Sequence, residues 1–290
     1  MDLCFGIFVS RDRVQGRGAF IYPAGSLSMW VDLTMPGKYN WWFRISLPGF
    51  VFGVKILDWC VERINPRSMI AIVGPSGGGK SLLVRNTASY HLSRGGFVAY
   101  LALDDDPQHV VNSLSSVAGE ELVRSSISRG AFRIIDGFSH RMLPLKPPQD
   151  IISRSISSLT PEEILSAVRL ESAYMSERGG GGIMIIDSYN EILSSIEISS
   201  ATELLKRIRA VASKGYGVTT LVIIHTDSED IAEWLKTIEN VLDGVVVTNL
   251  EMDIAKKRVT RYFYIKKMRA SAHCVEPIEY RVDKGKIVPP

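Results

Sequence analysis

One short segment constrains the fold of this chain more than any other, because it fits the pattern of glycine, four residues, glycine, lysine and serine. It consists of Gly74, Pro75, Ser76, Gly77, Gly78, Gly79, Lys80 and Ser81. Glycines permit a loop whose backbone amides point inward at phosphate oxygens. An apolar run precedes the segment at 69–73, and an amphipathic stretch follows it at 81–92. This context predicts a strand, a phosphate-binding loop and a helix whose positive end faces the anion.

The loop also predicts how a nucleotide and its ion are held. Lys80 is expected to bridge the terminal phosphates of ATP, and the hydroxyl of Ser81 is expected to hold Mg²⁺. A second apolar run, at 183–186, ends at Asp187. We expect the carboxylate of Asp187 to act on the Mg²⁺ through water. ATP and Mg²⁺ are therefore the expected cofactors.

From about residue 53 onward, short apolar runs alternate with amphipathic stretches, which is typical of a parallel sheet covered by helices. Thr160 and Ser200 each precede a glutamate by three residues, which predicts two helix starts. The helix at 231–238 is expected to pack on the core, and 139–160 to form a surface loop. The expected strands are 69–73, 97–102, 132–135, 183–186, 219–224 and 244–248. The predicted fold class is α/β, with a twisted, mostly parallel central sheet.

The end of the chain changes character after Leu250. Residues 261–267 alternate between polar and apolar and follow a polar turn near Lys256. This pattern predicts an antiparallel C-terminal hairpin that closes the sheet, followed by a last strand near 278–282.

Composition excludes several classes of protein. With 46% hydrophobic and 22% charged residues, the 290-residue chain can bury a core, and a net charge of +3 indicates no particular partner. Apolar runs stay short of the roughly 18 residues of a membrane span, so we expect a soluble protein without one. Cys4, Cys60 and Cys274 are far apart and odd in number. They fit a reducing cytoplasm better than a disulfide framework or a zinc site.

Aromatic residues are unevenly distributed, since 11 of them precede residue 54. We therefore expect two parts, a small β-rich N-terminal extension at 1–52 and one domain at 53–290. The side chains of Trp30, Trp41, Trp42 and Phe43 are expected to pack within the chain. A neighbouring subunit, or an unidentified protein partner bound through the extension, is the alternative.

The acids that follow the strand at 97–102 point to a family. They read Leu103-Asp104-Asp105-Asp106-Pro107, and Asp104 lies 24 residues beyond Lys80. Together with Asp187-Ser188, residues 243–246 and Lys267-Met268-Arg269, they make residues 53–290 resemble the RecA superfamily. The resemblance is most specific to the KaiC-like branch and its archaeal single-domain members, and it implies a RecA-like P-loop ATPase fold.

Two other P-loop families fit less well. ATPases of the ABC and AAA types place a catalytic glutamate directly after the strand acid, where this chain has Ser188. An LSGGQ-like signature is also missing from the sequence between the two motifs.

The resemblance implies a role for each pair of matching residues. Asp104 and Asp105 would polarise the attacking water, although an ordinary acidic turn is the alternative. Lys267 and Arg269 would reach the nucleotide of a neighbouring subunit in a homo-oligomeric ring, such as a hexamer, and a solvated basic strand is the alternative.

Two polar residues after the strand at 219–224 complete the expected site. His225 and Thr226 occupy the position from which RecA-like proteins sense the terminal phosphate, at the edge of the sheet where ligands collect. A polar strand end without such a duty is the alternative.

The expected function is that of an ATP-binding protein and slow Mg²⁺-dependent ATPase that serves as a nucleotide-driven assembly or regulatory module. Hydrolysis is expected to be slow because aspartate is one methylene shorter than the family's glutamate. An ATP-binding switch with negligible hydrolysis is one alternative, and a recombinase-type DNA-binding ATPase is another. Nucleic acid is not favoured, because residues 226–230 are acidic and repel phosphate.

Overall fold

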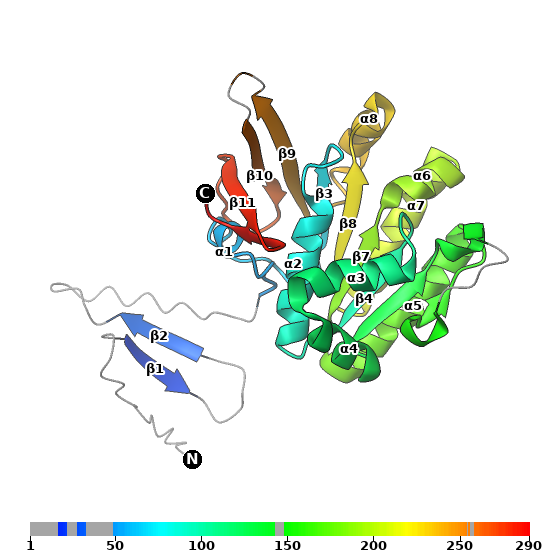
Figure 1. Cartoon of the computed structure of the whole chain (residues 1–290), viewed down its shortest axis with the longest axis horizontal. Coiled ribbons are helices and arrows are strands. Elements are labelled where there is room, and N and C mark those ends of the chain that lie inside the picture. Colours follow the sequence, from blue (N-terminus) through cyan, green and yellow to red (C-terminus); the bar gives the residue numbers. More distant parts are fainter. Residues whose placement is uncertain (1–16, 22–27, 33–48, 143–147, 254, 256–257) are drawn as a thin grey trace, which may run out of the picture. The chain divides into compact units, whose positions relative to one another are not determined.

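The computed structural model describes residues 17–21, 28–32, 49–142, 148–253, 255 and 258–290. The chain divides into two compact units, Met1–Gly49 and Phe50–Pro290 (Figure 1). In the first unit, β1 (Arg17–Ile21) pairs antiparallel with β2 (Ser28–Asp32). The predictions for Cys4 and for the packing of Trp30, Trp41, Trp42 and Phe43 fall outside the described residues and side chains.

The second unit is built on one ten-stranded sheet, in the order β12-β11-β10-β9-β3-β8-β7-β4-β5-β6. The strands from β9 to β6 in this order run parallel, and β10, β11 and β12 are added antiparallel at the other edge. The predicted α/β fold class is confirmed. The strands are β3 (Met69–Gly74), β4 (Val98–Ala102), β5 (Phe132–Asp136), β6 (Arg154–Ser155), β7 (Ile183–Asp187), β8 (Thr219–His225), β9 (Gly244–Asp253), β10 (Arg258–Met268), β11 (Ile278–Asp283) and β12 (Lys286–Val288).

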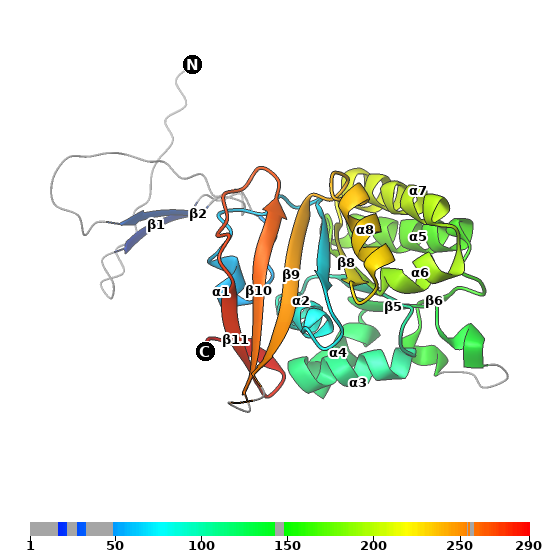
Figure 2. The ribbon, with the colours of Figure 1, turned by 90° about the horizontal axis from the view of Figure 1, so that it is seen from above.

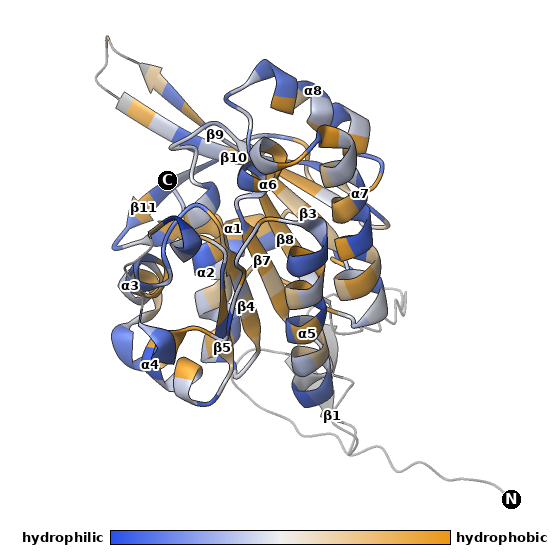
Figure 3. Cartoon of the chain, turned by 90° about the vertical axis from the view of Figure 1, so that its right-hand side faces the viewer, coloured by the Kyte–Doolittle hydropathy of each residue, from blue (hydrophilic) through white to orange (hydrophobic). Residues whose placement is uncertain are grey.

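Helices cover both faces of the parallel part of this sheet, which explains why its central strands are mostly apolar (Figures 2 and 3). Side chains alternate along a strand, so Ile70 and Ile72 pack with α2, α3 and α4, whereas Met69, Ala71 and Val73 pack with α5 to α8. The helices are α1 (Lys55–Asp58), α2 (Lys80–Ser93), α3 (Pro107–Ala118), α4 (Glu120–Ser128), α5 (Pro161–Gly179), α6 (Tyr189–Ser195), α7 (Ile198–Ile208) and α8 (Glu229–Ile238).

One of the two predicted helix starts is correct. Thr160 caps α5, and its hydroxyl accepts a hydrogen bond from the amide of Glu163 at 3.4 Å. The start at Ser200 is wrong, because the backbone of α7 is already helical there. Its first helical hydrogen bond runs from the amide of Ala201 to the carbonyl of Glu197 (2.9 Å).

The packing role predicted for the helix at 231–238 is confirmed, since Trp234, Leu235 and Ile238 of α8 are buried in the core. The loop predicted at 139–160 is more structured than expected. It contains the short 3₁₀ turns η1 (Ser139–Met142) and η2 (Gln149–Ile151) and the two-residue strand β6. β6 was missed because two residues are too few to show a periodic pattern.

The expectation of unpaired cysteines is wrong for Cys60 and Cys274, which form a disulfide. Backbone hydrogen bonds bring them together. The amide of Cys274 donates to the carbonyl of Cys60 (2.9 Å), and the amide of Glu62 donates to the carbonyl of Ala272 (2.9 Å). Their Cα atoms lie 5.1 Å apart although 214 positions separate them in the sequence. Linear spacing could not reveal this pairing.

The longest helix is α5, with 19 residues. Among the described residues, helices that combine sufficient length and hydrophobicity to cross a membrane are absent.

Candidate active site

Four neighbouring strands bring most of the predicted site residues to one edge of the sheet. β3, β8, β7 and β4 are adjacent and parallel, so their carboxyl ends lie side by side. The phosphate loop follows β3, His225 ends β8, Asp187 ends β7, and Asp104 follows β4. This is the edge at which open parallel sheets bind their ligands.

Glycine is required at several positions of the phosphate loop, of which two show the reasons clearly. Gly79 has a φ of 97° directly before α2, in the left-handed region that other residues avoid. A Cβ atom at Gly74 would overlap the carbonyl oxygen of Thr248 in β9. The loop therefore rests closely on the neighbouring strand.

Lys80 is folded back into the loop that it belongs to. Its Nζ donates to the carbonyls of Gly74 (2.9 Å) and Pro75 (2.7 Å), and the residue is only 3% exposed. Burial lowers the pKa of Lys80, while the charges of nearby aspartates oppose this shift. The ammonium group thus already lies among the phosphate-loop carbonyls and would have to turn to reach a phosphate.

Asp187 lies at the centre of the acidic part of the site. Its carboxylate accepts a hydrogen bond from the hydroxyl of Tyr100 in β4, and burial raises the pKa of Asp187 to about 6. Oxygen or nitrogen atoms of Asp187, Asp104 and His225 lie within 4.8 Å of one another, close enough to share a cation. Ser81 lines the same cavity. Carboxylate and hydroxyl oxygens are the ligands that Mg²⁺ prefers, so the residues present fit the predicted ion.

The three consecutive aspartates after β4 have different surroundings. Asp104 accepts hydrogen bonds from the amide (3.2 Å) and hydroxyl (2.9 Å) of Ser188. Burial would raise the pKa of Asp104, but these bonds and the neighbouring His225 outweigh it and hold that pKa below its usual value. Asp105 is 58% exposed and lies 3.5 Å from His109, and Asp106 caps α3. Only Asp104 is therefore bonded to the residues that end β7.

A cavity of about 220 Å³ adjoins these groups. It extends between α2 and α3 and is bounded by Ser81, Arg85, Ala88, Tyr100, Asp104, Asp105, His109, Val110, Ser113, Leu114, Asp187 and His225. The predicted magnesium ligands and both predicted water-polarising acids thus share one space.

His225 and Thr226 contact the site in different ways. The Nε2 atom of His225 lies 3.5 Å from a carboxylate oxygen of Asp104, so its imidazole faces the acids. Thr226 meets the phosphate loop through its backbone, since its amide donates to the carbonyl of Gly74 (3.1 Å).

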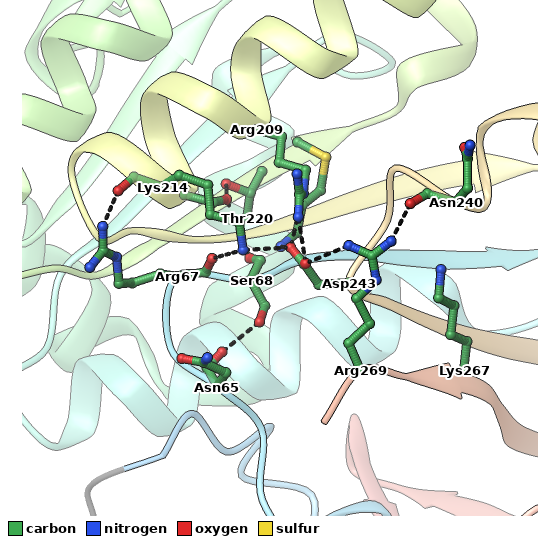
Figure 4. A network of polar contacts seen from close by, with 12 residues as sticks. Asn65, Arg67, Ser68, Arg209, Lys214, Thr220, Asn240, Asp243, Lys267 and Arg269 are labelled. Atoms are coloured by element: carbon green, nitrogen blue, oxygen red, sulfur yellow. Dashed lines mark hydrogen bonds and ion pairs between the residues drawn. The ribbon is translucent and has the colours of Figure 1, made fainter. Parts of the chain in front are cut away.

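Lys267 and Arg269 lie near Asp243, beside the amino ends of β3 and β9 (Figure 4). Lys267 donates to the carbonyl of Glu239 (2.5 Å), and Arg269 donates to that of Asn240. Arg269 also lies 3.6 Å from the carboxylate of Asp243, which directly precedes β9. β9 begins beside Ile70, about 13 Å before the end of β3 at the usual rise per residue. Neither cation is brought to the phosphate loop of its own chain.

Four contacts of the site were not anticipated. Asp227 accepts hydrogen bonds from the amide (3.0 Å) and hydroxyl (2.8 Å) of Ser76 in the phosphate loop. Tyr100 holds Asp187, Tyr280 of β11 donates to the carbonyl of Gly78 (3.2 Å), and Asn190 of α6 contacts His225. Asp227 could have been found from its place just after β8, whereas the other three carry no signal in the sequence.

Comparison with known proteins agrees with this geometry. A family model described as "ATPase: KaiC" matches residues 51–288, well over half of the chain. The chain belongs to the KaiC ATPase family. A crystal structure of a KaiC-like protein from the archaeon Pyrococcus horikoshii is similar, with a TM-score of 0.64 and 16% identity, covering 83% of this chain and 98% of that one. At this identity the likeness shows the shared fold, which is RecA-like.

Similarity in sequence also extends to ATP-binding proteins of transporters. The energy-coupling factor transporter ATP-binding protein EcfA2 of Mesomycoplasma hyopneumoniae strain 7448 is 23% identical over 221 residues. The alignment covers 67% of this chain and 73% of that protein, and the strain J protein is 22% identical over the same length. Together with the KaiC family, these relatives support ATP binding and membership of the P-loop ATPases in general.

Proposed function

We propose that this KaiC-family protein is a slow Mg²⁺-dependent ATPase whose nucleotide state drives assembly or regulation. The observation that carries the proposal is that Asp187, Asp104 and Ser81, the last residue of the phosphate-loop motif, line one cavity. A phosphate-binding loop, an oxygen set for Mg²⁺ and a carboxylate for water are the parts that phosphoryl transfer to water requires.

Binding would begin at the loop that precedes α2. Its backbone amides and the positive end of α2 would receive the phosphates, and Lys80 would exchange its bonds to Gly74 and Pro75 for phosphate oxygens. Ser81 and Asp187 would hold Mg²⁺, which neutralises charge that develops on the phosphates. Tyr100 would keep the Asp187 carboxylate turned toward that ion.

Asp104 is the residue that we assign to the attacking water. Its carboxylate would accept a proton from the water as the oxygen bonds to the terminal phosphorus and the bond to ADP breaks. Both hydrogen bonds from Ser188 fall on one of its oxygens, Oδ1, and the other oxygen faces His225. A short side chain that is held in this way supports slow turnover rather than fast turnover.

Lys267 and Arg269 would act only between subunits. Because they lie beside the amino ends of β3 and β9, away from the phosphate loop, they would reach the nucleotide of a neighbouring copy in a ring. A cation supplied across an interface contributes about 10³ to 10⁵ in rate in other NTPases. Turnover would then depend on assembly, which is the basis of the regulatory role.

The decisive experiment combines mass in solution, with and without MgATP, and an assay of phosphate release. We expect MgATP to increase the mass and the assembled protein to release phosphate slowly. Asp104→Asn should lower kcat by about 100-fold or more, as expected for loss of a general base. Asp150→Asn, which removes an exposed aspartate of η2, serves as the matched control and should leave kcat unchanged.

Two outcomes would contradict the proposal. The first is phosphate release at background level by protein that is assembled and binds nucleotide. The protein would then be an ATP-dependent switch and not an ATPase. A greater loss of kcat for Asp105→Asn than for Asp104→Asn would overturn the assignment of the water to Asp104.

A further inference from the structure

Asn190, in the first turn of α6, makes two hydrogen bonds to the end of β8. Its Nδ2 donates to the carbonyl of His225 (2.9 Å), and its Oδ1 accepts from the amide of His225 (2.8 Å). A side-chain amide that satisfies both backbone groups of one residue fixes that residue in position and in orientation. The backbone of His225 is thus held by the helix that follows β7, in addition to its pairing within the sheet.

These bonds belong to a network of polar contacts that joins the ends of three strands. The imidazole of His225 faces Asp104 at 3.5 Å, and Asp104 accepts two hydrogen bonds from Ser188. Ser188 and Asn190 lie two positions apart at the start of α6. The network therefore connects the end of β8 with the loop after β4, that loop with the end of β7, and the end of β7 with β8 again.

Two members of this network, His225 and Asp104, are open to the cavity of the proposed site. Ser188, its innermost member, is 1% exposed, whereas the side chains of His225 and Asp104 are 27% and 31% exposed. His225 and Asp104 both line the cavity that Ser81 borders. A displacement of His225 by even 1 Å would misplace its imidazole relative to a bound phosphate, and such shifts have large effects on oriented sites.

We propose that Asn190 is a positioning residue, which holds His225 at the phosphate end of the site and thereby lets the protein distinguish ATP from ADP. The proposal rests on the nucleotide binding proposed above but not on hydrolysis. Asn190 acts through His225, so its contribution is expected to disappear when the imidazole is removed.

The experiment measures the affinities of a non-hydrolysable ATP analogue and of ADP, both with Mg²⁺. We expect Asn190→Ala to reduce the preference for the analogue by about tenfold and to leave ADP affinity unchanged, which is the scale of one or two lost hydrogen bonds. His225→Ala should produce the same loss. In the double variant, Asn190→Ala should add nothing further, because its only route to the phosphate has been removed.

Ser194→Ala is the matched control in α6, since it removes a hydroxyl that bonds to the carbonyl of Glu191 (3.0 Å) within the same helix. It should keep the wild-type preference. If Asn190→Ala does not fold, Asn190→Ser provides the same comparison with a shorter polar side chain and should show the same loss.

The inference is overturned if the Asn190 variants retain the wild-type preference, or if the losses of Asn190→Ala and His225→Ala add in the double variant. In both cases the wild type binds both nucleotides, so the proposed function stands. If the wild type binds neither nucleotide, the proposed function fails and this inference fails with it.

Discussion

At the scale of single residues, three consecutive aspartates make different contacts. Asp104, Asp105 and Asp106 are consecutive, yet one bonds to Ser188, one faces solvent and His109, and one caps a helix. A run of three aspartates indicates a candidate site, but the direction of each carboxylate follows from the turn between β4 and α3. The contacts of Asp106 fit the acidic-turn alternative, and those of Asp104 fit the proposed catalytic role.

Asp58 supports a pH-dependent prediction about stability. Its carboxylate accepts a hydrogen bond from the amide of Phe52 (2.7 Å), yet burial raises the pKa of Asp58 from 3.8 to about 6. Below pH 3.8 the carboxyl is neutral in both the folded and the unfolded chain. Between pH 3.8 and 6 the unfolded chain is already ionised at this group while the folded chain keeps the proton, so stability falls as the pH rises, by at most about 3 kcal/mol, and then stays constant above pH 6.

Asp58→Asn keeps an oxygen for the Phe52 amide and removes the charge. Urea unfolding should therefore show the variant to be more stable than the wild type at pH 8 and equally stable at pH 4. A difference in unfolding free energy that is the same at both pH values would contradict this explanation.

At the scale of elements, the strands were easier to predict than their edges and connections. β3, β4, β5, β7, β8 and the first half of β9 are mostly apolar and buried, because helices cover both faces of this part of the sheet. β6 and β12 have only two and three residues, which gives no period to detect. The start of α7 was misplaced because its first hydrogen bonds involve the backbone alone.

The packing of α5 on the edge of the sheet depends on one buried charge. Glu171 of α5 is fully buried and pairs with Arg133 of β5 and with Arg154 of β6, the latter at 2.8 Å. Removing the charge of Glu171 would leave the Arg133 guanidinium, whose side chain is 19% exposed, without its counter-ion. Breaking such a buried pair from one side costs about 3 to 5 kcal/mol.

We therefore expect Glu171→Gln to lower the free energy of unfolding, measured with denaturant, by about 3 kcal/mol. Glu203→Gln is the matched control, because Glu203 is 63% exposed and lies 3.6 Å from Lys206 within α7. Its effect should stay within about 0.5 kcal/mol. Equal effects of the two substitutions would show that burial of Glu171 is unimportant.

At the scale of the whole molecule, the two predicted groups of catalytic residues occupy opposite edges of one sheet. The phosphate loop and Asp104 lie at the carboxyl edge, and Lys267 and Arg269 lie at the amino edge beside Asp243. A head-to-tail ring would bring the two edges of adjacent copies together. Lys267 and Arg269 would then complete a site only in the assembled protein.

Mixed assemblies test this arrangement. Lys80→Ala should disable the nucleotide site but keep Lys267 and Arg269. Arg269→Ala should keep the nucleotide site but remove one of these two cations. Each variant alone should therefore be inactive. In an equal mixture that exchanges subunits at random, about a quarter of the sites combine an intact phosphate loop with an intact neighbouring cation. We expect phosphate release to recover to about that fraction of the wild-type rate, and no recovery would contradict action between subunits.

The sequence by itself determined the fold class, the phosphate loop and the acid at the end of β7. These features depend on local patterns, because an apolar run followed by glycines and a lysine specifies its structure over a few consecutive residues. Only the tertiary structure decided which of the three aspartates bonds to Ser188 and that Asn190 holds His225. It also decided that Cys60 pairs with Cys274, and that Lys267 and Arg269 lie away from their own phosphate loop. Each of these depends on which strands become neighbours in the sheet, and strand order is set by packing between residues far apart in the chain.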